Sequence, residues 1–377
     1  MTQKGSQMVM VDGSRFLIEG LASAGAEVYV GYPITPANWL YAYASQRFPT
    51  FLAAPDEISA LQWAAGFSAT GKLPVTGTSF PGFALMTETL NMAYMMELPM
   101  VIVLAQRMGP STGSATTGAQ GDLLLLRSII SGGYPLPVFS PSNLKDCWEL
   151  AASSVRTALQ LRTPVVLLTS KEMIMTQHSF DLSELSTISH IPWASSRENG
   201  EYQPYRADEH LIPPFLPVGN TRHQVRLNAS THDATGLIRK ATPEALANTR
   251  RLREKLEQRL AEFSFFEYDP QEGAEQLIVT YGITAEAARD ALAILRKKGQ
   301  TVSLLVMKTL LPVPAEAKTI IDAYRHVIIA EENLTGLLAE MLFGIVGNRR
   351  LRNVNKIGNL ITPTEIVKEV AQCQKTS

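Results

Sequence analysis

Three polar side chains in the first part of the chain are of types that bind or protonate small organic acids: Thr35, Glu57 and Arg107. A threonine hydroxyl at a helix N-terminus can hold a carboxylate, because the free N–H groups there favour negative charge. An arginine offers two parallel donors to the same group. A glutamic acid in an apolar pocket would keep its proton and could exchange it with a bound heterocycle.

Each of these residues also has an ordinary structural explanation. Thr35 can cap a helix that begins at Pro36, since proline suits the first helical position. Glu57 can pair with the dipole of the helix that it begins. Arg107 can be a partly exposed partner in an ion pair. The residue types alone leave both explanations open for all three.

The predicted secondary structure places the three residues after strands. Runs of β-branched and aromatic residues bounded by Gly and Pro predict buried strands, and apolar residues at helical spacing predict the helices between them. The strands are expected at residues 26–30, 51–53, 74–78, 100–105 and 165–169. The helices are expected at residues 13–24, 36–47, 57–70, 83–96, 122–130 and 144–160. This alternation predicts a parallel sheet covered on both faces, with ligands bound beyond the carboxyl ends of its strands.

Two glycine-containing loops also follow predicted strands. In Ser79-Phe80-Pro81-Gly82-Phe83, Gly82 allows a backbone or a ligand to approach closely. In Gly109-Pro110-Ser111-Thr112-Gly113, directly after Arg107, the main chain and the hydroxyls of Ser111 and Thr112 supply further donors. These loops are weak signals individually, but they lie where a site is expected.

The C-terminal part repeats the alternation after a long interruption. Residues 190 to about 241 are rich in Pro, Asn, Arg and His without a sustained period. A charged helix is expected next, at 243–263, and we interpret its charges as a solvated face. Strands are expected again at 277–281, 302–307 and 327–331, and helices at 284–298, 315–324, 336–346 and 363–372. We therefore expect an α/β protein with parallel-sheet domains at 1–190 and 273–377, joined by an irregular connection at 191–272.

Composition argues against several classes of protein. With 34 Lys+Arg against 35 Asp+Glu in 377 residues, the formal net charge is -1, which indicates no general attraction to nucleic acid or to anionic membranes. Two distant cysteines, Cys147 and Cys373, favour a reducing compartment and no metal or iron–sulfur site in this chain. Residues 1–11 lack the apolar core of a signal peptide, so we expect a cytoplasmic protein.

The chain also lacks the usual motifs for binding phosphate. It has no P-loop, no GxGxxG after a strand and no nucleophile elbow. Gly121-Asp122 is followed by Leu123, whereas many enzymes hold a metal and a diphosphate with Gly-Asp-Gly. The sequence thus predicts one end of a site, for a carboxylate, without the other.

As a set, the motifs resemble those of the α subunit of the 2-oxoacid:ferredoxin oxidoreductases, in the same order and over nearly the whole chain. The N-terminal motifs are Tyr32-Pro33-Ile34-Thr35-Pro36, Asp56-Glu57-Ile58, Pro81-Gly82-Phe83, Gln106-Arg107 with Gly109-Pro110-Ser111-Thr112-Gly113, and Gln120-Gly121-Asp122. The later motifs are His232-Asp233, Tyr281-Gly282, Leu310-Leu311-Pro312 and Glu331-Glu332-Asn333-Leu334.

The resemblance implies a thiamine diphosphate enzyme whose α subunit has a pyrimidine-binding domain and a transketolase C-terminal-like domain. A partner β subunit would supply the diphosphate and Mg²⁺ site and a 4Fe–4S cluster, in a heterodimer or an (αβ)₂ heterotetramer. A 2-oxoacid would be decarboxylated oxidatively with coenzyme A, and the electrons would pass to ferredoxin.

The resemblance also implies roles for individual residues. Glu57, Thr35 and Arg107 would be catalytic, with Glu57 bonded to the cofactor's aminopyrimidine. Gly82 and Phe83 would also contact the cofactor. Ser111 and Thr112 would join Thr35 and Arg107 in binding the substrate.

Some residues depart from the family pattern, which leaves the substrate open. Pro55 stands where the family pattern has an acidic residue, and Phe80 and Met108 stand where it has glycines. The larger side chains of Phe80 and Met108 are expected to change the shape of the pocket. The loop after Arg107 is more similar to that of the 2-oxoglutarate and branched-chain members than to that of the pyruvate members. Two alternatives remain: a partner-binding module that has kept the fold without catalysis, and a non-oxidative thiamine-dependent decarboxylase or ketol transferase.

Overall fold

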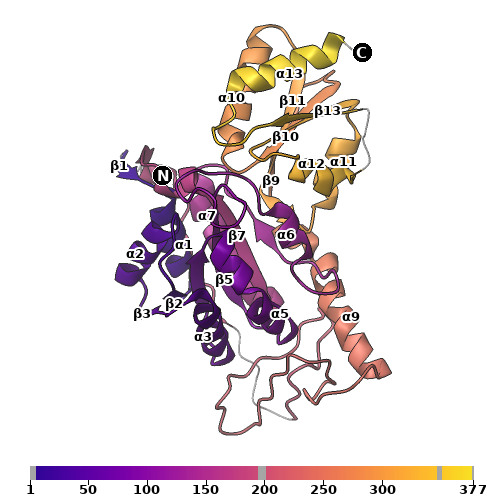
Figure 1. The fold of residues 1–377 in the computed structure, drawn as a ribbon. Coiled ribbons are helices and arrows are strands. Elements are labelled where there is room, and N and C mark those ends of the chain that lie inside the picture. Colours follow the sequence, from indigo (N-terminus) through magenta and orange to yellow (C-terminus); the bar gives the residue numbers. More distant parts are fainter. Residues whose placement is uncertain (1–5, 194–200, 346–349, 376–377) are drawn as a thin grey trace.

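The computed structural model describes residues 6–193, 201–345 and 350–375. Within these residues the chain forms a seven-stranded and a five-stranded sheet, each covered by helices, and a separate two-stranded pair. Figure 1 shows the unit built on the five-stranded sheet above the unit built on the seven-stranded sheet. The expected α/β class with two mainly parallel sheets is confirmed.

The first unit is built on the seven-stranded sheet. Its strand order is β12 (Thr309–Leu311), β6 (Val138–Phe139), β7 (Pro164–Ser170), β5 (Met100–Gln106), β4 (Pro74–Thr78), β2 (Val28–Gly31) and β3 (Thr50–Ala53). All neighbours pair in parallel except β12 and β6. Strands β5 and β7 are buried along their whole length, which explains their continuous apolar sequences.

Helices alternate with these strands. They are α1 (Gly13–Ala24), α2 (Asn38–Arg47), α3 (Glu57–Ala69), α4 (Phe80–Leu85), α5 (Thr87–Met95), α6 (Leu123–Ser128), α7 (Leu144–Leu161) and α8 (Lys171–Met175). The single helix expected at 83–96 is wrong, because α4 starts earlier and ends at Leu85. Pro81 suits the first turn of α4, and the Thr87 hydroxyl donates to the Ala84 carbonyl at the break between the two helices.

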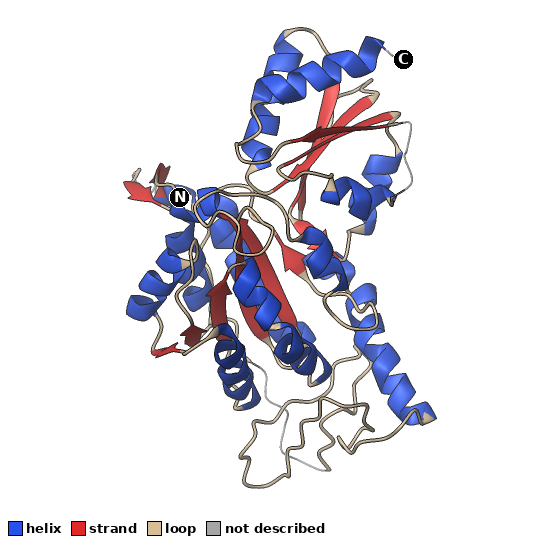
Figure 2. Cartoon of the chain, in the orientation of Figure 1, coloured by secondary structure: helices blue, strands red, loops and turns tan. Residues whose placement is uncertain are grey.

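The second unit is built on the five-stranded sheet, whose strands are red in Figure 2. Its strand order is β14 (Leu351–Asn355), β13 (His326–Glu331), β10 (Gln276–Tyr281), β11 (Val302–Met307) and β9 (Phe266–Asp269). Only β9 runs antiparallel to its neighbour. The helices are α10 (Thr284–Lys297), α11 (Ala315–Asp322), α12 (Leu337–Phe343) and α13 (Pro363–Lys375). Helices α10 and α13 pack together over a hydrophobic cluster separate from the main core.

Several short strands are absent from the sequence prediction. Strand β1 (Met8–Val11) pairs with β8 (His178–Asp181), and β6, β9, β12 and β14 were not expected either. These strands have two to five residues, too few for a reliable period. Strand β12 matters most, because it lies within residues 273–377 and yet extends the sheet of the first unit. The proposed domain boundaries, 1–190, 191–272 and 273–377, therefore remain a proposal.

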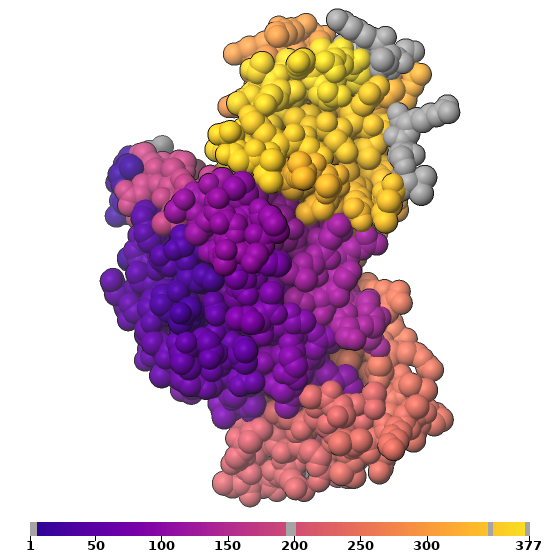
Figure 3. Space-filling view, viewed as in Figure 1, coloured from indigo at the N-terminus to yellow at the C-terminus, as the bar shows by residue number. Residues whose placement is uncertain are grey.

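The connection packs against the edge of the first sheet where the parallel strands begin. The Val218 N–H donates to the Ala69 carbonyl, ahead of β4, at 2.8 Å. Arg162, ahead of β7, donates to the Pro213 and Pro214 carbonyls at 3.1 and 2.7 Å. In Figure 3 the connection forms the base of the molecule. It thus covers the edge of the sheet opposite to the one where ligands are expected.

Helix α9 (Pro243–Gln258) buries part of the charge that we expected to be solvated. Arg251 and Lys255 are 7% and 2% exposed, and both bind the fully buried carboxylate of Glu97, which precedes β5. Lys255 Nζ lies 2.6 Å from Glu97 Oε1, and Arg251 Nη1 lies 3.0 Å from the same atom. The solvated-face prediction fails for these residues because α9 lies against the first unit.

The helices of the described residues are all too short or too polar to cross a lipid bilayer.

Candidate functional site

Loops that follow four neighbouring strands meet at one edge of the first sheet. Strands β3, β2, β4 and β5 are adjacent and parallel, so their carboxyl ends share an edge. Thr35, Glu57, Gly82 and Arg107 all lie just beyond those ends. The strand order therefore brings together Thr35 and Arg107, which are 72 residues apart in sequence, at the place where open α/β sheets bind ligands.

The backbone after β2 differs from the expected helix cap. Helix α2 begins at Asn38 because the Ala37 backbone before it, with φ -75° and ψ 7°, is not helical, and no side chain caps the helix. The prediction that Pro36 opens the helix and Thr35 caps it is therefore wrong. The Thr35 hydroxyl instead accepts a hydrogen bond from Asn38 Nδ2 at 3.0 Å. No described residue accepts the hydroxyl proton, which can therefore be donated to a ligand.

Arg107 is held directly against Thr35. It is 7% exposed, and its Nη1 donates to the Thr35 carbonyl oxygen at 2.5 Å. Its Nε is buried without a hydrogen-bond partner. Burial lowers the pKa of the guanidinium, while the carboxyl groups of Asp122 and Glu57 raise it. A buried guanidinium with an unused N–H, next to a hydroxyl with an unused proton, is suited to binding a carboxylate.

Glu57 does not serve as the cap of α3. That role belongs to Asp56, whose Oδ1 accepts a hydrogen bond from the Ser59 N–H at 2.7 Å. Glu57 is 7% exposed, and no described residue donates a hydrogen bond to its carboxyl group. Buried polar groups are usually paired. The explanation of Glu57 as an ordinary acid at a helix start is therefore weaker than the sequence suggested.

Gly82 leaves the space that the Glu57 side chain occupies. A Cβ atom at Gly82 would lie 2.5 Å from Glu57 Oε1 and 2.3 Å from Thr78 Oγ1. Only glycine therefore fits without moving the carboxyl group. The next residue, Phe83, is fully buried and its ring belongs to the hydrophobic core. Contact of Phe83 with a cofactor stays a prediction. Because the ring is in the core, such a contact would have to come from the main chain of Phe83.

Ser111 and Thr112 lie at the exposed tip of the loop after Arg107. The Ser114 N–H donates to the Met108 carbonyl oxygen at 2.9 Å and closes the loop. A Cβ atom at Gly113 would lie 1.6 Å from that same oxygen, so the turn requires glycine. Neither hydroxyl bonds to the other site residues, and their role in substrate binding stays a prediction.

Asp122 belongs to this site, although the sequence analysis did not select it. It is 4% exposed, and its Oδ2 is buried without a hydrogen-bond partner. Burial raises the pKa of its carboxyl group to about 7, with Arg107 acting in the opposite direction. The sequence shows Gly121-Asp122 as an incomplete metal motif and as part of the family motif Gln120-Gly121-Asp122, and neither pattern assigns the Asp122 side chain a role.

The second unit holds the loop that carries Asp122. Gln120 Nε2 donates to the Tyr281 carbonyl, at the end of β10, at 2.9 Å. Its Oε1 accepts hydrogen bonds from the Glu332 N–H at 2.7 Å and from Thr284 Oγ1 at 3.0 Å. Because Gln120 is 1% exposed, this contact between the units is buried. The motifs at 120–122, 281–282 and 331–334 therefore meet at one junction.

The donor set fits one end of thiamine diphosphate. A buried, unpaired carboxyl group at Glu57 suits an aminopyrimidine ring, which both donates and accepts hydrogen bonds. The described residues contain no cluster of three His, Cys, Asp or Glu side chains that could hold a metal ion. The edge of the sheet thus offers groups suited to the pyrimidine and to a carboxylate.

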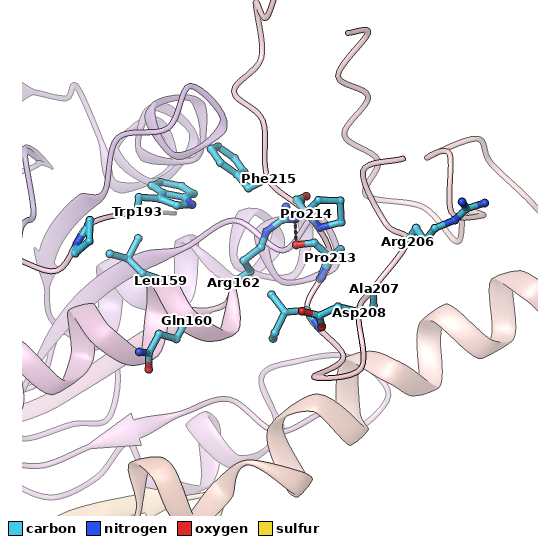
Figure 4. A pocket seen from close by; sticks show the side chains of 12 residues that line it. Leu159, Gln160, Arg162, Trp193, Arg206, Ala207, Asp208, Pro213, Pro214 and Phe215 are labelled. Atoms are coloured by element: carbon cyan, nitrogen blue, oxygen red, sulfur yellow. Dashed lines mark hydrogen bonds between the residues drawn. The ribbon is translucent and has the colours of Figure 1, made fainter. Parts of the chain in front are cut away.

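A cavity of about 530 Å³ lies elsewhere, between the connection and the C-terminal end of α7. Figure 4 shows Arg162, Trp193 and Phe215 among its lining residues. The rings of Trp193 and Phe215 stack with centroids 4.3 Å apart. Arg162 precedes β7, so this cavity lies at the edge of the sheet opposite to Glu57 and is not part of the candidate site.

Comparison with known families matches both units. Residues 19–251 match the model described as "Pyruvate flavodoxin/ferredoxin oxidoreductase, thiamine diP-bdg". Residues 274–366 match the model of the pyruvate:ferredoxin oxidoreductase core domain II. The first match covers more than half of the chain, so the thiamine diphosphate-binding domain predicted from the motifs is confirmed.

Individual relatives agree with this assignment. The 2-oxoglutarate synthase subunit KorA of Archaeoglobus fulgidus is 27% identical over 373 residues, covering 97% of this chain and 99% of that protein. A 2-oxoglutarate:ferredoxin oxidoreductase from Magnetococcus marinus, solved with 2-oxoglutarate, coenzyme A and succinyl-CoA bound, superposes with a TM-score of 0.90 at 28% identity; the match covers 98% of this chain and 66% of that chain. A split-gene transketolase superposes with a TM-score of 0.53 at 16% identity and supports the fold alone. The chain belongs to the 2-oxoacid:ferredoxin oxidoreductase family and is of its α-subunit type.

Proposed function

We propose that this chain is the catalytic α subunit of a thiamine-dependent 2-oxoacid:ferredoxin oxidoreductase whose substrate is 2-oxoglutarate. The enzyme would convert the 2-oxoacid and coenzyme A to acyl-CoA and CO₂ and pass electrons to ferredoxin through a β subunit, in the cytoplasm. The observation that carries the proposal is the position of Glu57 at the carboxyl edge of the first sheet: it is 7% exposed, no described residue donates a hydrogen bond to its carboxyl group, and Arg107 and Thr35 lie at the same edge. The similarity to a 2-oxoglutarate synthase subunit and to a 2-oxoglutarate:ferredoxin oxidoreductase supports 2-oxoglutarate as the substrate.

Glu57 would hold the aminopyrimidine of thiamine diphosphate. When bound, thiamine diphosphate supplies the carbon nucleophile and the electron sink for decarboxylation. The contribution of Glu57 is a proton held at its carboxyl group and exchanged with the ring nitrogen that faces it. Gly82 contributes the space in which that carboxyl group sits.

Arg107 and Thr35 would bind the carboxylate that the substrate loses as CO₂. Arg107 has one buried N–H without a partner, and the Thr35 hydroxyl has its proton available. Both are already oriented, since Arg107 bonds to the Thr35 main chain. Fixed donors of this kind orient a substrate without having to be ordered when it binds.

A partner subunit would cover the exposed face of α3. A helix that is apolar on most sides is normally buried, yet Ile58 and Trp63 of α3 are 43% and 42% exposed, as is Leu85 of the neighbouring α4 at 52%. This face begins next to Glu57. We propose that the β subunit docks here with the Mg²⁺ and diphosphate end of the site and a 4Fe–4S cluster, forming an (αβ)₂ enzyme.

The test of the function is purification of the chain with its native partner. We expect a brown, iron-containing second subunit and reduction of ferredoxin that depends on 2-oxoglutarate and coenzyme A. A complex that releases CO₂ without reducing an acceptor would favour the non-oxidative alternative. A complex that binds no thiamine diphosphate would favour the non-catalytic module.

The isolated chain should bind thiamine diphosphate weakly or not at all. It has the residues proposed for the pyrimidine end of the site, whereas its sequence lacks Gly-Asp-Gly and its described residues contain no metal-binding cluster of His, Cys, Asp or Glu. Calorimetric titration with cofactor and Mg²⁺, first of the chain alone and then of the complex, measures this. Tight binding by the chain alone would contradict a shared site.

Arg107→Lys should lower kcat/KM for the 2-oxoacid by about one to two orders of magnitude, because a charged hydrogen bond contributes about 1.5–3 kcal/mol. Lysine lacks the planar pair of donors and cannot keep both the Thr35 carbonyl and a substrate carboxylate. The affinity for cofactor should be unchanged. The matched control is Arg127→Lys on the surface of α6, which should leave steady-state kinetics intact. Parent-like kinetics of Arg107→Lys would mean that the carboxylate binds elsewhere.

A further inference from the structure

Two buried polar atoms of the candidate site have no hydrogen-bond partner among the described residues. One is Arg107 Nε, a donor, and the other is Asp122 Oδ2. No salt bridge joins the two side chains, although each affects the pKa of the other. Buried polar atoms of native proteins are nearly always satisfied by protein, water or ligand. These two atoms are therefore available to bind a polar ligand.

A carboxylate ligand can satisfy both atoms only if Asp122 is protonated. Carboxylate oxygens accept hydrogen bonds and donate none, so they can take the N–H of Arg107 directly. They can bond to Asp122 only when that residue carries a proton and acts as a donor. An ionised Asp122 would repel the ligand and compete with it for the guanidinium.

Other charged groups face Asp122 from several elements. Arg107 follows β5, with Glu57 at the start of α3 acting on the guanidinium. Burial raises the pKa of Tyr281, at the end of β10, and the charges of Glu331, Asp122 and Glu332 raise it further. Glu331 ends β13, and Glu332 follows it. Of these groups, only the guanidinium acts on the Asp122 carboxyl group itself, and burial of that carboxyl group outweighs it and raises its pKa.

The position of Asp122 is set by the junction between the units. Its own N–H donates to Gln106 Oε1 at 3.3 Å. Two residues before it, Gln120 bonds to the second unit through both ends of its amide group. Both units therefore hold the main chain around Asp122, whose side chain is 4% exposed.

From this geometry we propose that Asp122 is a positioning residue that admits the 2-oxoacid carboxylate to Arg107 only while it carries a proton. The inference rests on the proposed function and adds a device that regulates substrate binding. Binding of the anionic substrate draws a proton from solvent onto the Asp122 carboxyl group, where it bridges to the substrate. Above neutral pH the proton concentration of the solvent is lower, so the affinity for the 2-oxoacid falls.

The sign of the pH dependence follows from the raised pKa. Asp122 titrates at about 7 instead of its ordinary 3.8. It is mostly protonated at lower pH and mostly ionised at higher pH, so KM for the 2-oxoacid should rise about tenfold between pH 6 and pH 8. Asp122→Asn cannot ionise and keeps an N–H donor, so its KM should be flat over the same range.

The deciding measurement is proton uptake on binding, which does not depend on turnover. We would titrate the assembled αβ complex at neutral pH with N-oxalylglycine, a 2-oxoglutarate analogue whose amide replaces the reactive carbonyl, in two buffers of different ionisation enthalpy. The parent should take up about half a proton per site. Absence of uptake by the parent would overturn the proposal, and this arm needs no variant to fold.

Two variants assign the proton. Uptake should vanish in Asp122→Asn and persist in Glu332→Gln, the matched control, because burial also raises the pKa of Glu332 to about 7. Uptake retained in Asp122→Asn, or lost in Glu332→Gln, would overturn the assignment to Asp122. A complex that turns over 2-oxoacid without this pH dependence would refute only this inference, whereas a complex without turnover would refute the proposed function.

Discussion

Glu57→Gln should slow exchange of the proton at the reactive carbon of bound thiamine diphosphate by about two to four orders of magnitude, the range typical of lost general acid–base catalysis. The amide has the size of the carboxyl group and fits the space that Gly82 leaves, but it cannot give up or take back a proton. Complex assembly and iron content should remain normal, because neither depends on this proton.

The measurement is hydrogen–deuterium exchange at that carbon in the assembled complex, by rapid quench and NMR. Asp56→Ala is the matched control: it removes the cap of the same helix and should leave exchange unchanged. If Glu57 only complemented the helix dipole, its replacement would cost no more than about 1 kcal/mol of stability and leave exchange intact. Parent-like exchange in Glu57→Gln would contradict the catalytic role proposed for Glu57, and the family assignment would then describe only the fold of this chain.

Glu97→Gln should destabilise the folded chain by about 3 to 5 kcal/mol, because it leaves buried cations without their counterion. Glu97 is fully buried and binds both Arg251 and Lys255 of α9. These two contacts bring α9, and with it the end of the connection, against the first unit. Loss of the carboxylate should therefore also expose the connection to proteases.

Chemical unfolding and limited proteolysis of parent and variant test this prediction. Glu88→Gln, an exposed glutamate on the preceding helix, should change stability by less than about 0.5 kcal/mol. The attraction of Arg251 and Lys255 holds the pKa of Glu97 well below its ordinary 4.5. The stabilisation that Glu97 contributes is therefore complete above pH 4.5, and it is lost as the pH falls from there through the lowered pKa. A Glu97→Gln variant as stable as the Glu88 control would show that α9 is held by apolar packing alone.

The sequence by itself determined the alternation of elements and the neighbourhood of the site. Long strands and helices have patterns strong enough to read, and the predicted strands at 74–78 and 302–307 match β4 and β11 residue for residue. In a parallel sheet, the loops after adjacent strands must share an edge. Once the strands were recognised, Thr35, Glu57, Gly82 and Arg107 could be expected near one another.

Tertiary structure decided what each side chain contacts. The sequence predicts that Thr35 caps a helix beginning at Pro36. In the structure the helix begins at Asn38, and the Thr35 hydroxyl accepts a hydrogen bond from the Asn38 side chain. The sequence pattern predicts that Arg251 and Lys255 are solvated, but both are buried against Glu97, which is more than 150 residues away in the sequence. Local patterns carry no information on such long-range pairs.

Asp122 shows the same limit within the site. Its sequence neighbours suggest only a helix start, and its side chain makes no cap. Its burial, its missing partner and its proximity to Arg107 arise because Gln120 joins the loop to the second unit. The pKa of a carboxyl group depends on desolvation and on charges brought close in space. The sequence therefore suggested which residues could bind a carboxylate, whereas only the tertiary structure shows that the Asp122 carboxyl group is buried without a partner and interacts with Arg107.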